Sequence, residues 1–485
     1  MQAFCNLKAS EVLVPKPLIV NDKLGFCDVR EAYLAFDEPL LNEALLASDM
    51  LALPIGRHAG HTKSVVQLRQ RVETESVSEC AYRIEIEPDS ILCESSSAEG
   101  IWYAVQILRQ LFATFETLIP CSTICDGPSY AWRGFMLDTA RHFFTVEFIK
   151  KLLDLAAQHR LNRFHWHLTD DQGWTIPVKD YPKLVHRNSS SYSNEEIREI
   201  IAFASARHIE VIAEIDMPGH MLGALSAYPA FGCTKGPYSI ATDGGIFEDV
   251  LCMGNDDAIT FAKTVIREVA ELFPSRYIHI GGDECPTVRW QECSLCKARM
   301  KDLHIASSSG LQRWFTNEMI RVATDSKKIP ICWDDVSDTE EHKRVSKQCI
   351  VMVWRNSESA LRLAKEGYQV VMCPKLDGCY LDYRHLDTPE EPGTIGVNTV
   401  RSSYEFSIPE GNRNLMLGGQ ANVWTEKICS EERAEYMLFP RLCAISEALW
   451  LPKHKKNFVD FTSRLEIHTR RLIKQGVNVY RGPLQ

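Results

Sequence analysis

The chain has 485 residues, 45% of them hydrophobic and 24% charged, which is the balance of a soluble globular protein with more than one domain. A net charge of −10 and the lack of any lysine or arginine block argue against a nucleic-acid partner. No apolar run reaches the roughly 18 residues that a membrane span needs. No signal peptide is visible, so we expect either a protein that stays inside the cell or one whose leader has been removed. The composition indicates no oligomeric state.

The first 127 residues predict a small α+β domain. Residues 82–87 and 90–94 have the alternating pattern of strands, and residues 98–112 carry apolar side chains at helical spacing. Strands followed by a helix favour this class of domain. The turn cluster Cys-Asp-Gly-Pro-Ser at 125–129 marks a boundary, so we expect domains at 1–127 and 128–485.

The rest of the chain predicts a barrel. Short apolar strands alternate with amphipathic helical stretches, which indicates repeated βα units and a parallel sheet. About eight strands over roughly 350 residues fit an α/β fold of the (β/α)₈ (TIM) barrel type with insertions. Long loops are expected at 217–256 and 387–407. The predicted strands are residues 133–137, 163–168, 210–215, 277–281, 330–333, 350–354, 369–373 and 415–419.

Every predicted barrel strand is followed by an acid, an arginine or a tryptophan. The active site of such a barrel is built from the C-terminal ends of its strands. A purely structural barrel has no reason to crowd one rim in this way. These residues are Asp138 and Arg141, Asp170 and Asp171, Asp216 and His220, Asp283 and Glu284, Trp333 with Asp334 and Asp335, Trp354, Tyr380 and Asp382, and Trp424 and Glu426.

The adjacent acids Asp283 and Glu284 are the most informative pair on this rim. Gly281 and Gly282 precede them and let a ligand come close to the backbone. Desolvation and mutual repulsion are expected to push the two carboxyl pKa values apart, which leaves one proton available near neutral pH. A protonated acid beside a charged one can cleave an acetal. The alternative is a strand-end turn with two solvated acids.

Three tryptophans, Trp333, Trp354 and Trp424, come from three regions at the ends of predicted strands. Any one of them alone would more often fill a core. Together, each near an acid or another polar residue, they favour a pocket for a ring. Aromatic faces suit the apolar faces of a sugar, and acids or arginine suit its hydroxyls.

At this point the chain resembles the family 20 glycoside hydrolases, the β-N-acetylhexosaminidases. The resemblance runs from about residue 128 onward, and the first section is similar to the small α+β domain that these enzymes carry. The matching segments are WRGFMLDTARH from Trp132, HWHLTDDQGW from His165, EIDMPGH from Glu214, HIGGDE from His279, YLD from Tyr380 and GGQANVWTE from Gly418.

The resemblance implies an exo-acting, retaining enzyme that releases terminal β-linked GlcNAc or GalNAc from glycans without cofactor or metal. The substrate's own 2-acetamido oxygen would attack C1 and form an oxazolinium ring, a recognised exception to the two-carboxylate scheme. Glu284 would be the general acid and base. Asp283 would orient the acetamido N–H and stabilise the positive charge, and Tyr380 would donate to the acetamido oxygen.

The same resemblance implies roles for the remaining rim residues. Arg141, Glu426 and Asp382 would bind sugar hydroxyls, and the three tryptophans would enclose the ring. Asp170 and His220 would form a relay behind Glu284; otherwise Asp170 caps a loop and His220 is a buried histidine bonded to backbone. The choice between glucosamine and galactosamine, the linkage and the glycan length stay open.

Two positions depart from the family pattern. Thr175 follows Trp174 where arginine is common, and Ala213 stands where proline is common. Neither touches the proposed chemistry. The histidines at 165 and 167 are expected to pack and orient rather than to bind a ligand.

Two other functions compete with this interpretation. A metal-dependent hydrolase would use a binuclear cage of His165, His167, His220, His279 and Asp283, but it would leave the tryptophans, Arg141 and Glu284 without a role. A non-catalytic sugar-binding barrel would need the tryptophans and the arginine. It would not need the combination of Asp283, Glu284 and Tyr380.

The 17 cysteines are odd in number, so they cannot all pair within the chain. Several lie in apolar strands (Cys332, Cys373, Cys443), where a thiol behaves as a small hydrophobe, which favours a reducing compartment. A separate cluster contains Cys285, Cys293 and Cys296, with Cys233 and Cys252 upstream. One C-x-x-C supplies only two of the four ligands of a structural zinc site. We therefore expect free thiols there, with a disulfide or a metal as the alternatives.

Overall fold

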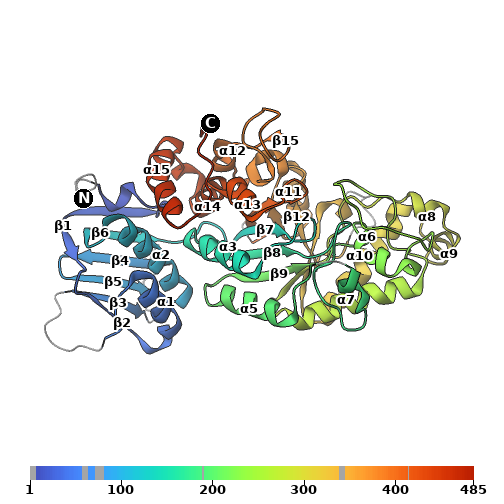
Figure 1. The fold of residues 1–485 in the computed structure, drawn as a ribbon, viewed down its shortest axis with the longest axis horizontal. Helices are drawn as coiled ribbons and strands as arrows, with labels where there is room; N and C mark the ends of the chain where they lie inside the picture. The colour runs from blue at the N-terminus through green and yellow to red at the C-terminus, as the bar shows by residue number, and fades with distance from the viewer. Residues whose placement is uncertain are drawn as a thin grey trace.

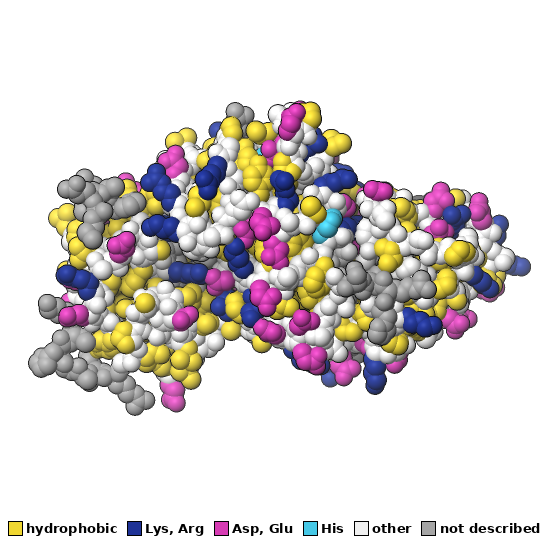
Figure 2. All heavy atoms as spheres, in the orientation of Figure 1, with side chains coloured by type: hydrophobic (Ala, Val, Ile, Leu, Met, Phe, Trp, Pro, Cys, Tyr) yellow, Lys and Arg dark blue, Asp and Glu magenta, His cyan; other side chains and the backbone are white. Residues whose placement is uncertain are grey.

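The computed structural model describes residues 7–56, 64–71, 81–187, 190–337, 345–412 and 414–484. Figure 1 shows a sheet with two helices at the N-terminal end, a barrel beside it, and the last helices of the chain lying along both. Within the described residues, no helix combines the length and the apolar character that crossing a membrane requires. On the face drawn in Figure 2, acidic and basic side chains are interspersed rather than gathered by sign.

The N-terminal part is a six-stranded mixed sheet in the order β1-β6-β4-β5-β3-β2. Helix α2 (Ala98–Phe115) packs on this sheet through a continuous apolar face, and the Ser97 side chain caps it by accepting from the N–H of Gly100. The two strands and the helix predicted here are present. The elements are β1 (Ile19–Asp28), β2 (Tyr33–Phe36), α1 (Leu41–Leu51), β3 (Val65–Gln70), β4 (Tyr82–Glu87), β5 (Ser90–Ser95) and β6 (Leu118–Asp126).

Eight parallel strands close the second part into a barrel, in the order β7-β8-β9-β10-β11-β12-β13-β16. The predicted (β/α)₈ barrel after a small α+β domain is confirmed. The last strand runs to Val423, four residues beyond the prediction, because residues 418–423 pair in register with the first strand. The strands are β7 (Trp132–Asp138), β8 (Arg163–His167), β9 (Glu210–Glu214), β10 (Tyr277–His279), β11 (Ile329–Trp333), β12 (Ile350–Val353), β13 (Val370–Met372) and β16 (Met416–Val423).

Helices surround the barrel and bury their apolar faces against it. Two of them, α8 and α9, belong to an insertion after β10 and lie at the far end of the molecule from the N-terminal sheet (Figure 1). The helices are α3 (Val146–Gln158), α4 (Lys183–Arg187), α5 (Asn194–Ser205), α7 (Asp256–Leu272), α8 (Val288–Glu292), α9 (Ser294–Asp302), α10 (Ser308–Asp325), α11 (Ser357–Lys365), α13 (Glu431–Leu438), α14 (Arg441–Trp450) and α15 (Phe458–Lys474).

Both predicted long loops contain regular structure, so those predictions were wrong in part. The first holds α6 (Leu222–Ala227). The second holds β15 (Thr394–Val397), which pairs with β14 (Tyr383–Arg384), and α12 (Val400–Glu405). These elements are too short to show a periodic pattern of apolar residues, and only tertiary contacts make them stable.

One buried carboxylate, Asp126 at the end of β6, joins the N-terminal sheet to the barrel. Its Oδ2 accepts from the Tyr82 hydroxyl of the sheet and pairs with the guanidinium of Arg160, which follows α3. Its Oδ1 accepts from the indole N–H of Trp450 in α14 at 2.9 Å. The guanidinium carbon of Arg160 also lies 4.3 Å from the centre of the Trp450 ring. Because all these groups are buried, the joint tolerates no unpaired partner.

We therefore expect Asp126→Ala to destabilise the protein by about 3–5 kcal/mol, because the substitution leaves the Arg160 cation buried without its counter-charge. Urea unfolding followed by circular dichroism measures this loss. The matched control is Glu87→Ala, which removes the acid of the exposed Lys23–Glu87 pair and should cost less than about 1 kcal/mol. Equal losses in the two variants would show that the buried joint is not a major contribution.

Candidate active site

A cavity of about 210 Å³ opens at the C-terminal ends of the barrel strands. This volume is below the roughly 300–1,000 Å³ of sites for drug-sized ligands and suits a single sugar ring. Eight of the eleven predicted site residues line it; Asp170, His220 and Trp333 do not. The lining residues are Arg141, Asp283, Glu284, Trp354, Lys375, Tyr380, Asp382, Tyr383, Thr394, Trp424 and Glu426.

The two glycines before the acids are required by the fold. Gly281 and Gly282 have φ values of +64° and +106°, which side chains rarely adopt. A Cβ at position 281 would also lie 1.8 Å from Oδ1 of Asp216. The backbone therefore turns sharply after β10 and brings the next two residues, Asp283 and Glu284, to the cavity.

Asp283 is buried and faces Asp216, which follows β9 by two residues. Burial, and after it the charge of Asp216, hold the pKa of Asp283 well above its usual value. Burial raises the pKa of Asp216 to about 7. The two carboxyls titrate as a pair that retains a proton near neutral pH.

This pairing corrects one expectation from the sequence. Mutual repulsion between Asp283 and Glu284 was expected to separate their pKa values, but the strongest charge acting on Asp283 comes from Asp216. The reason is the fold, which places Asp283 within 4.8 Å of Asp216 on the neighbouring segment.

Glu284 lies at the end of a chain of charged groups. His220 Nε2 is 3.8 Å from a carboxylate oxygen of Glu284, and its Nδ1 is 3.1 Å from Asp170 Oδ1. The other oxygen of Asp170 lies 2.7 Å from Nη2 of Arg141. The predicted neighbours Asp170 and His220 are therefore brought together behind Glu284, whose side chain is 36% exposed to the cavity.

The charges in this chain are fixed by their partners. Burial alone would lower the pKa of His220, but the carboxylates of Asp170 and Asp171 outweigh it and hold the pKa well above its usual value. Burial alone would raise the pKa of Asp170, but Arg141 and His220 hold it well below the usual range. At neutral pH His220 is therefore a cation between two acid groups.

Aromatic rings form one side of the cavity. Trp354 directly follows β12, and Trp424 directly follows β16. The ring centre of Tyr380 lies 6.4 Å from that of Trp354 and 6.5 Å from that of Trp424. The Trp354 indole N–H donates to Asp335 at 2.7 Å, which fixes the ring. The ammonium of Lys375 lies 4.6 Å from the centre of the same ring.

Trp333 does not form a wall of the cavity, which corrects its predicted role. It is the last residue of β11 itself, so its side chain points into the barrel, where it is fully buried. Its indole N–H donates to Oε1 of Glu214 at 2.7 Å, and its ring centre lies 5.9 Å from that of Trp424. The buried Trp333 ring therefore packs near the ring of Trp424, which lines the cavity.

Polar groups line the cavity together with these rings. Burial, and then the charge of Glu426, raise the pKa of Asp382 to about 7. Burial also raises the pKa of Glu426, although Arg141, 3.9 Å away, opposes this. The Arg141 guanidinium carbon lies 5.0 Å from the centre of the Trp424 ring. The cavity therefore offers one cation and two acids to the hydroxyls of a ligand.

The barrel histidines gather around the carboxylate of Glu214. His165 Nε2, His167 Nδ1 and His279 Nδ1 lie 2.9, 2.5 and 3.0 Å from its oxygens. The packing and orienting role expected for His165 and His167 fits these contacts. Among the described residues, His220 and Asp283 belong to a separate group around Asp216, so the five-residue metal cage of the alternative interpretation is not assembled.

Some residues at this site were not identified from the sequence as members of it. Asp216 was recognised only as a strand-end acid, because its pairing with Asp283 depends on strands β9 and β10 lying side by side. Lys375, Tyr383 and Thr394 begin elements of only two to five residues, which are too short to give a periodic signal. The departure at Thr175 is structural, because its hydroxyl donates to the carbonyl of Leu168 at 2.8 Å within the loop after β8.

Comparisons with known proteins agree with this arrangement. Residues 130–453 match "Glycosyl hydrolase family 20, catalytic domain", and residues 14–127 match "Glycosyl hydrolase family 20, domain 2". A β-hexosaminidase of Porphyromonas gingivalis is 36% identical over 96% of this chain, which spans 62% of that relative's length. A β-N-acetylhexosaminidase of Cellulomonas fimi is 30% identical over 94% of this chain and 93% of its own length.

Solved structures show the same similarity. The exo β-N-acetylglucosaminidase of Vibrio harveyi, in complex with N-acetylglucosamine, superposes with a TM-score of 0.87 at 30% identity and covers 99% of this chain and 79% of its own. The β-N-acetylhexosaminidase of Streptomyces coelicolor A3(2) gives 0.85 at 25% identity, with 98% of both chains covered. The chain belongs to glycosyl hydrolase family 20.

Proposed function

We propose that the protein is an exo-acting, retaining β-N-acetylhexosaminidase that releases terminal β-linked GlcNAc or GalNAc from glycans. The observation that carries the proposal is one cavity of single-ring size in which Asp283, Glu284 and Tyr380 meet the rings of Trp354 and Trp424. The structural neighbour from Vibrio harveyi, named as an exo β-N-acetylglucosaminidase, supports the substrate class.

In the proposed first step, Glu284 gives its proton to the glycosidic oxygen while the C1–O bond breaks. The carbonyl oxygen of the substrate's own 2-acetamido group forms a bond to C1, and an oxazolinium ring results. In the second step, water attacks C1 and gives its proton to Glu284, and the ring opens. Two displacements at C1 retain the anomeric configuration.

Asp283 would stabilise the positive charge that develops on the acetamido group. For this role the proton shared with Asp216 must reside on Asp216 when the substrate is bound. The acetamido N–H and the cationic ring both favour an anion at Asp283, and His220 lowers the pKa of both acids. Tyr380, whose pKa burial holds well above its usual value, would donate a hydrogen bond to the acetamido oxygen.

Arg141, Asp382 and Glu426 would hold the hydroxyls of the terminal sugar, because all three line the cavity. Trp354 and Trp424 would pack against the apolar face of the ring. Asp170 and His220 would position Glu284 and set its proton affinity without touching the substrate.

Glu284→Gln should lower kcat on a chromogenic N-acetylglucosaminide by about 10²–10⁴-fold, because glutamine cannot transfer the proton. Circular dichroism should be unchanged, since the side chain is partly exposed. Glu358→Gln, the same change on the exposed surface of α11, serves as the control and should keep full activity. Near-normal turnover of Glu284→Gln would defeat the assigned role.

Asp283→Asn tests the route through the oxazolinium ion. The amide cannot balance the positive charge, so kcat should fall severely, and a thiazoline mimic of the cyclised intermediate should lose much of its affinity for the variant. Inhibition constants of this mimic for the wild-type and variant proteins measure the effect. A wild-type enzyme indifferent to the thiazoline would indicate an enzyme nucleophile instead.

Asp216→Asn should move the acidic limb of the kcat/KM profile to lower pH by roughly 1–3 units. The sign follows because burial, and after it the negative charge of Asp216, raise the pKa of Asp283 in the free enzyme, so removing that charge lets the Asp283 anion persist in more acid solution. The profile of kcat/KM reports groups of the free enzyme. Asp325→Asn, at the exposed end of α10, is the control; an acidic limb that stays in place or moves upward contradicts the pairing.

A further inference from the structure

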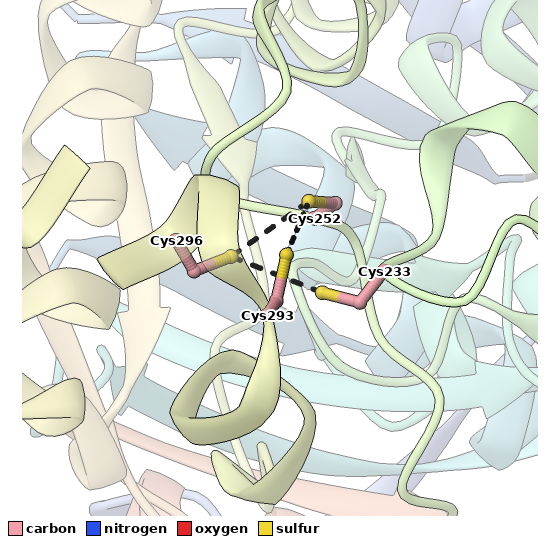
Figure 3. Close-up of side chains that lie close together, drawn as sticks. All are labelled: Cys233, Cys252, Cys293 and Cys296. Atoms are coloured by element: carbon pink, nitrogen blue, oxygen red, sulfur yellow. Dashed lines mark hydrogen bonds between the residues drawn. The ribbon is translucent and has the colours of Figure 1, made fainter. Parts of the chain in front are cut away.

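Four cysteines from two insertions of the barrel point their sulfurs toward one another (Figure 3). Cys233 and Cys252 belong to the segment between β9 and α7, and Cys293 and Cys296 lie at the start of α9. All four sulfur atoms lie within 4.8 Å of one another. Cys285, which the sequence grouped with them, is not part of the cluster, and its thiol faces the carbonyl of Pro286.

The separations between these sulfurs have the dimensions of a tetrahedral metal site. The Sγ–Sγ distances are 3.8 Å for Cys233–Cys296, 3.8 Å for Cys252–Cys293 and 3.7 Å for Cys252–Cys296. A tetrahedron with Zn–S bonds of about 2.3 Å has edges of about 3.8 Å. A disulfide would require about 2.05 Å. Cys252 and Cys296 each have two sulfur neighbours at this distance, which is the pattern of a four-way cluster and not of two pairs.

The surroundings favour thiolates at these positions. The N–H of Gly254 points at Cys296 Sγ, 3.3 Å away. A Cβ on Gly254 would lie 2.1 Å from the carbonyl carbon of Leu295, so only glycine allows this approach. Cys293 is the N-cap residue of α9, where the helix dipole favours negative charge.

We propose that Cys233, Cys252, Cys293 and Cys296 bind one Zn²⁺ as a closed structural site. Four thiolates leave no open position for a substrate or for water, and soft sulfur ligands in a tetrahedron select zinc over magnesium or calcium. Each thiol gives its proton to solvent on binding, so the site carries a net charge of −2. As expected from the sequence, none of the four cysteines is disulfide-bonded in the structure; the proposal takes up the metal that the sequence left as an alternative.

The position of this site gives it a consequence for the cavity. It joins the segment after β9, which carries His220, to the insertion after β10, which begins directly after Glu284. The two segments also touch closer to the cavity, where a Cβ on Gly219 would lie 3.2 Å from Cα of Cys285. The zinc would link the two segments that carry His220 and Glu284, at a second point further along the chain than the contact between Gly219 and Cys285.

Elemental analysis of the full-length protein, purified without metal-affinity resin, tests the proposal. We expect one zinc ion per chain. Cys252→Ser and Cys296→Ser should lose it, and the control Cys429→Ser, which removes an exposed thiol elsewhere, should keep it. Removing zinc with a chelator should lower the melting temperature of the wild-type protein, and added Zn²⁺ should restore it. This comparison does not depend on the variants folding.

Replacement of the bound metal by Co²⁺ identifies the ligands in the wild-type protein. Four thiolates in a tetrahedron give intense visible d–d bands and a sulfur-to-cobalt charge-transfer band. Protein without metal whose four thiols react freely would overturn the proposal, and so would an intact mass lower by four hydrogens, as two disulfides require. Iron in place of zinc, or unchanged zinc in Cys252→Ser, would overturn it as well.

Discussion

The C-terminal rim of the barrel depends on the buried carboxylate of Glu214. Burial alone would raise its pKa, but His279, His167 and His165 hold it well below the usual range. In return the pKa of His167 is raised to about 10, because Glu214 and Asp170 outweigh the effect of burial. A buried ion pair of this kind needs further hydrogen bonds to its charged groups, and the indole N–H of Trp333 gives Glu214 one more.

From Glu214 the charges alternate toward the cavity. The cation of His167 lies 2.9 Å from Asp170, and Asp170 bonds in turn to Arg141 and His220. His220 then faces Glu284. In this chain from Glu214 to Glu284, each group holds the charge of its neighbour. A change of protonation at one group therefore disturbs the next. Glu284, at the end of this chain, is more exposed than the other groups and lines the cavity.

Much of this rim could be predicted, because the C-terminal ends of parallel strands meet at one edge. The strand-end acids and Tyr380 are found there. The failures have a common cause, since a sequence gives no side-chain direction at a strand end. Trp333 and Trp354 look equivalent along the chain, yet the first closes β11 and points inward, while the second follows β12 and reaches the cavity. The cluster of four cysteines could likewise be recognised only from the fold, because the sequence does not show which way their side chains point.

The two residues at the end of the relay have unfavourable backbone conformations. His220 and Glu284 have φ values of +52° and +42°, a region that costs a residue with a side chain about 1–2 kcal/mol. Such conformations persist only where the surroundings impose them. The turn at Gly281 and Gly282 is imposed by contact with Asp216. The four cysteines lie in the continuation of both segments, so a zinc ion there would oppose their relaxation and keep His220 against Glu284.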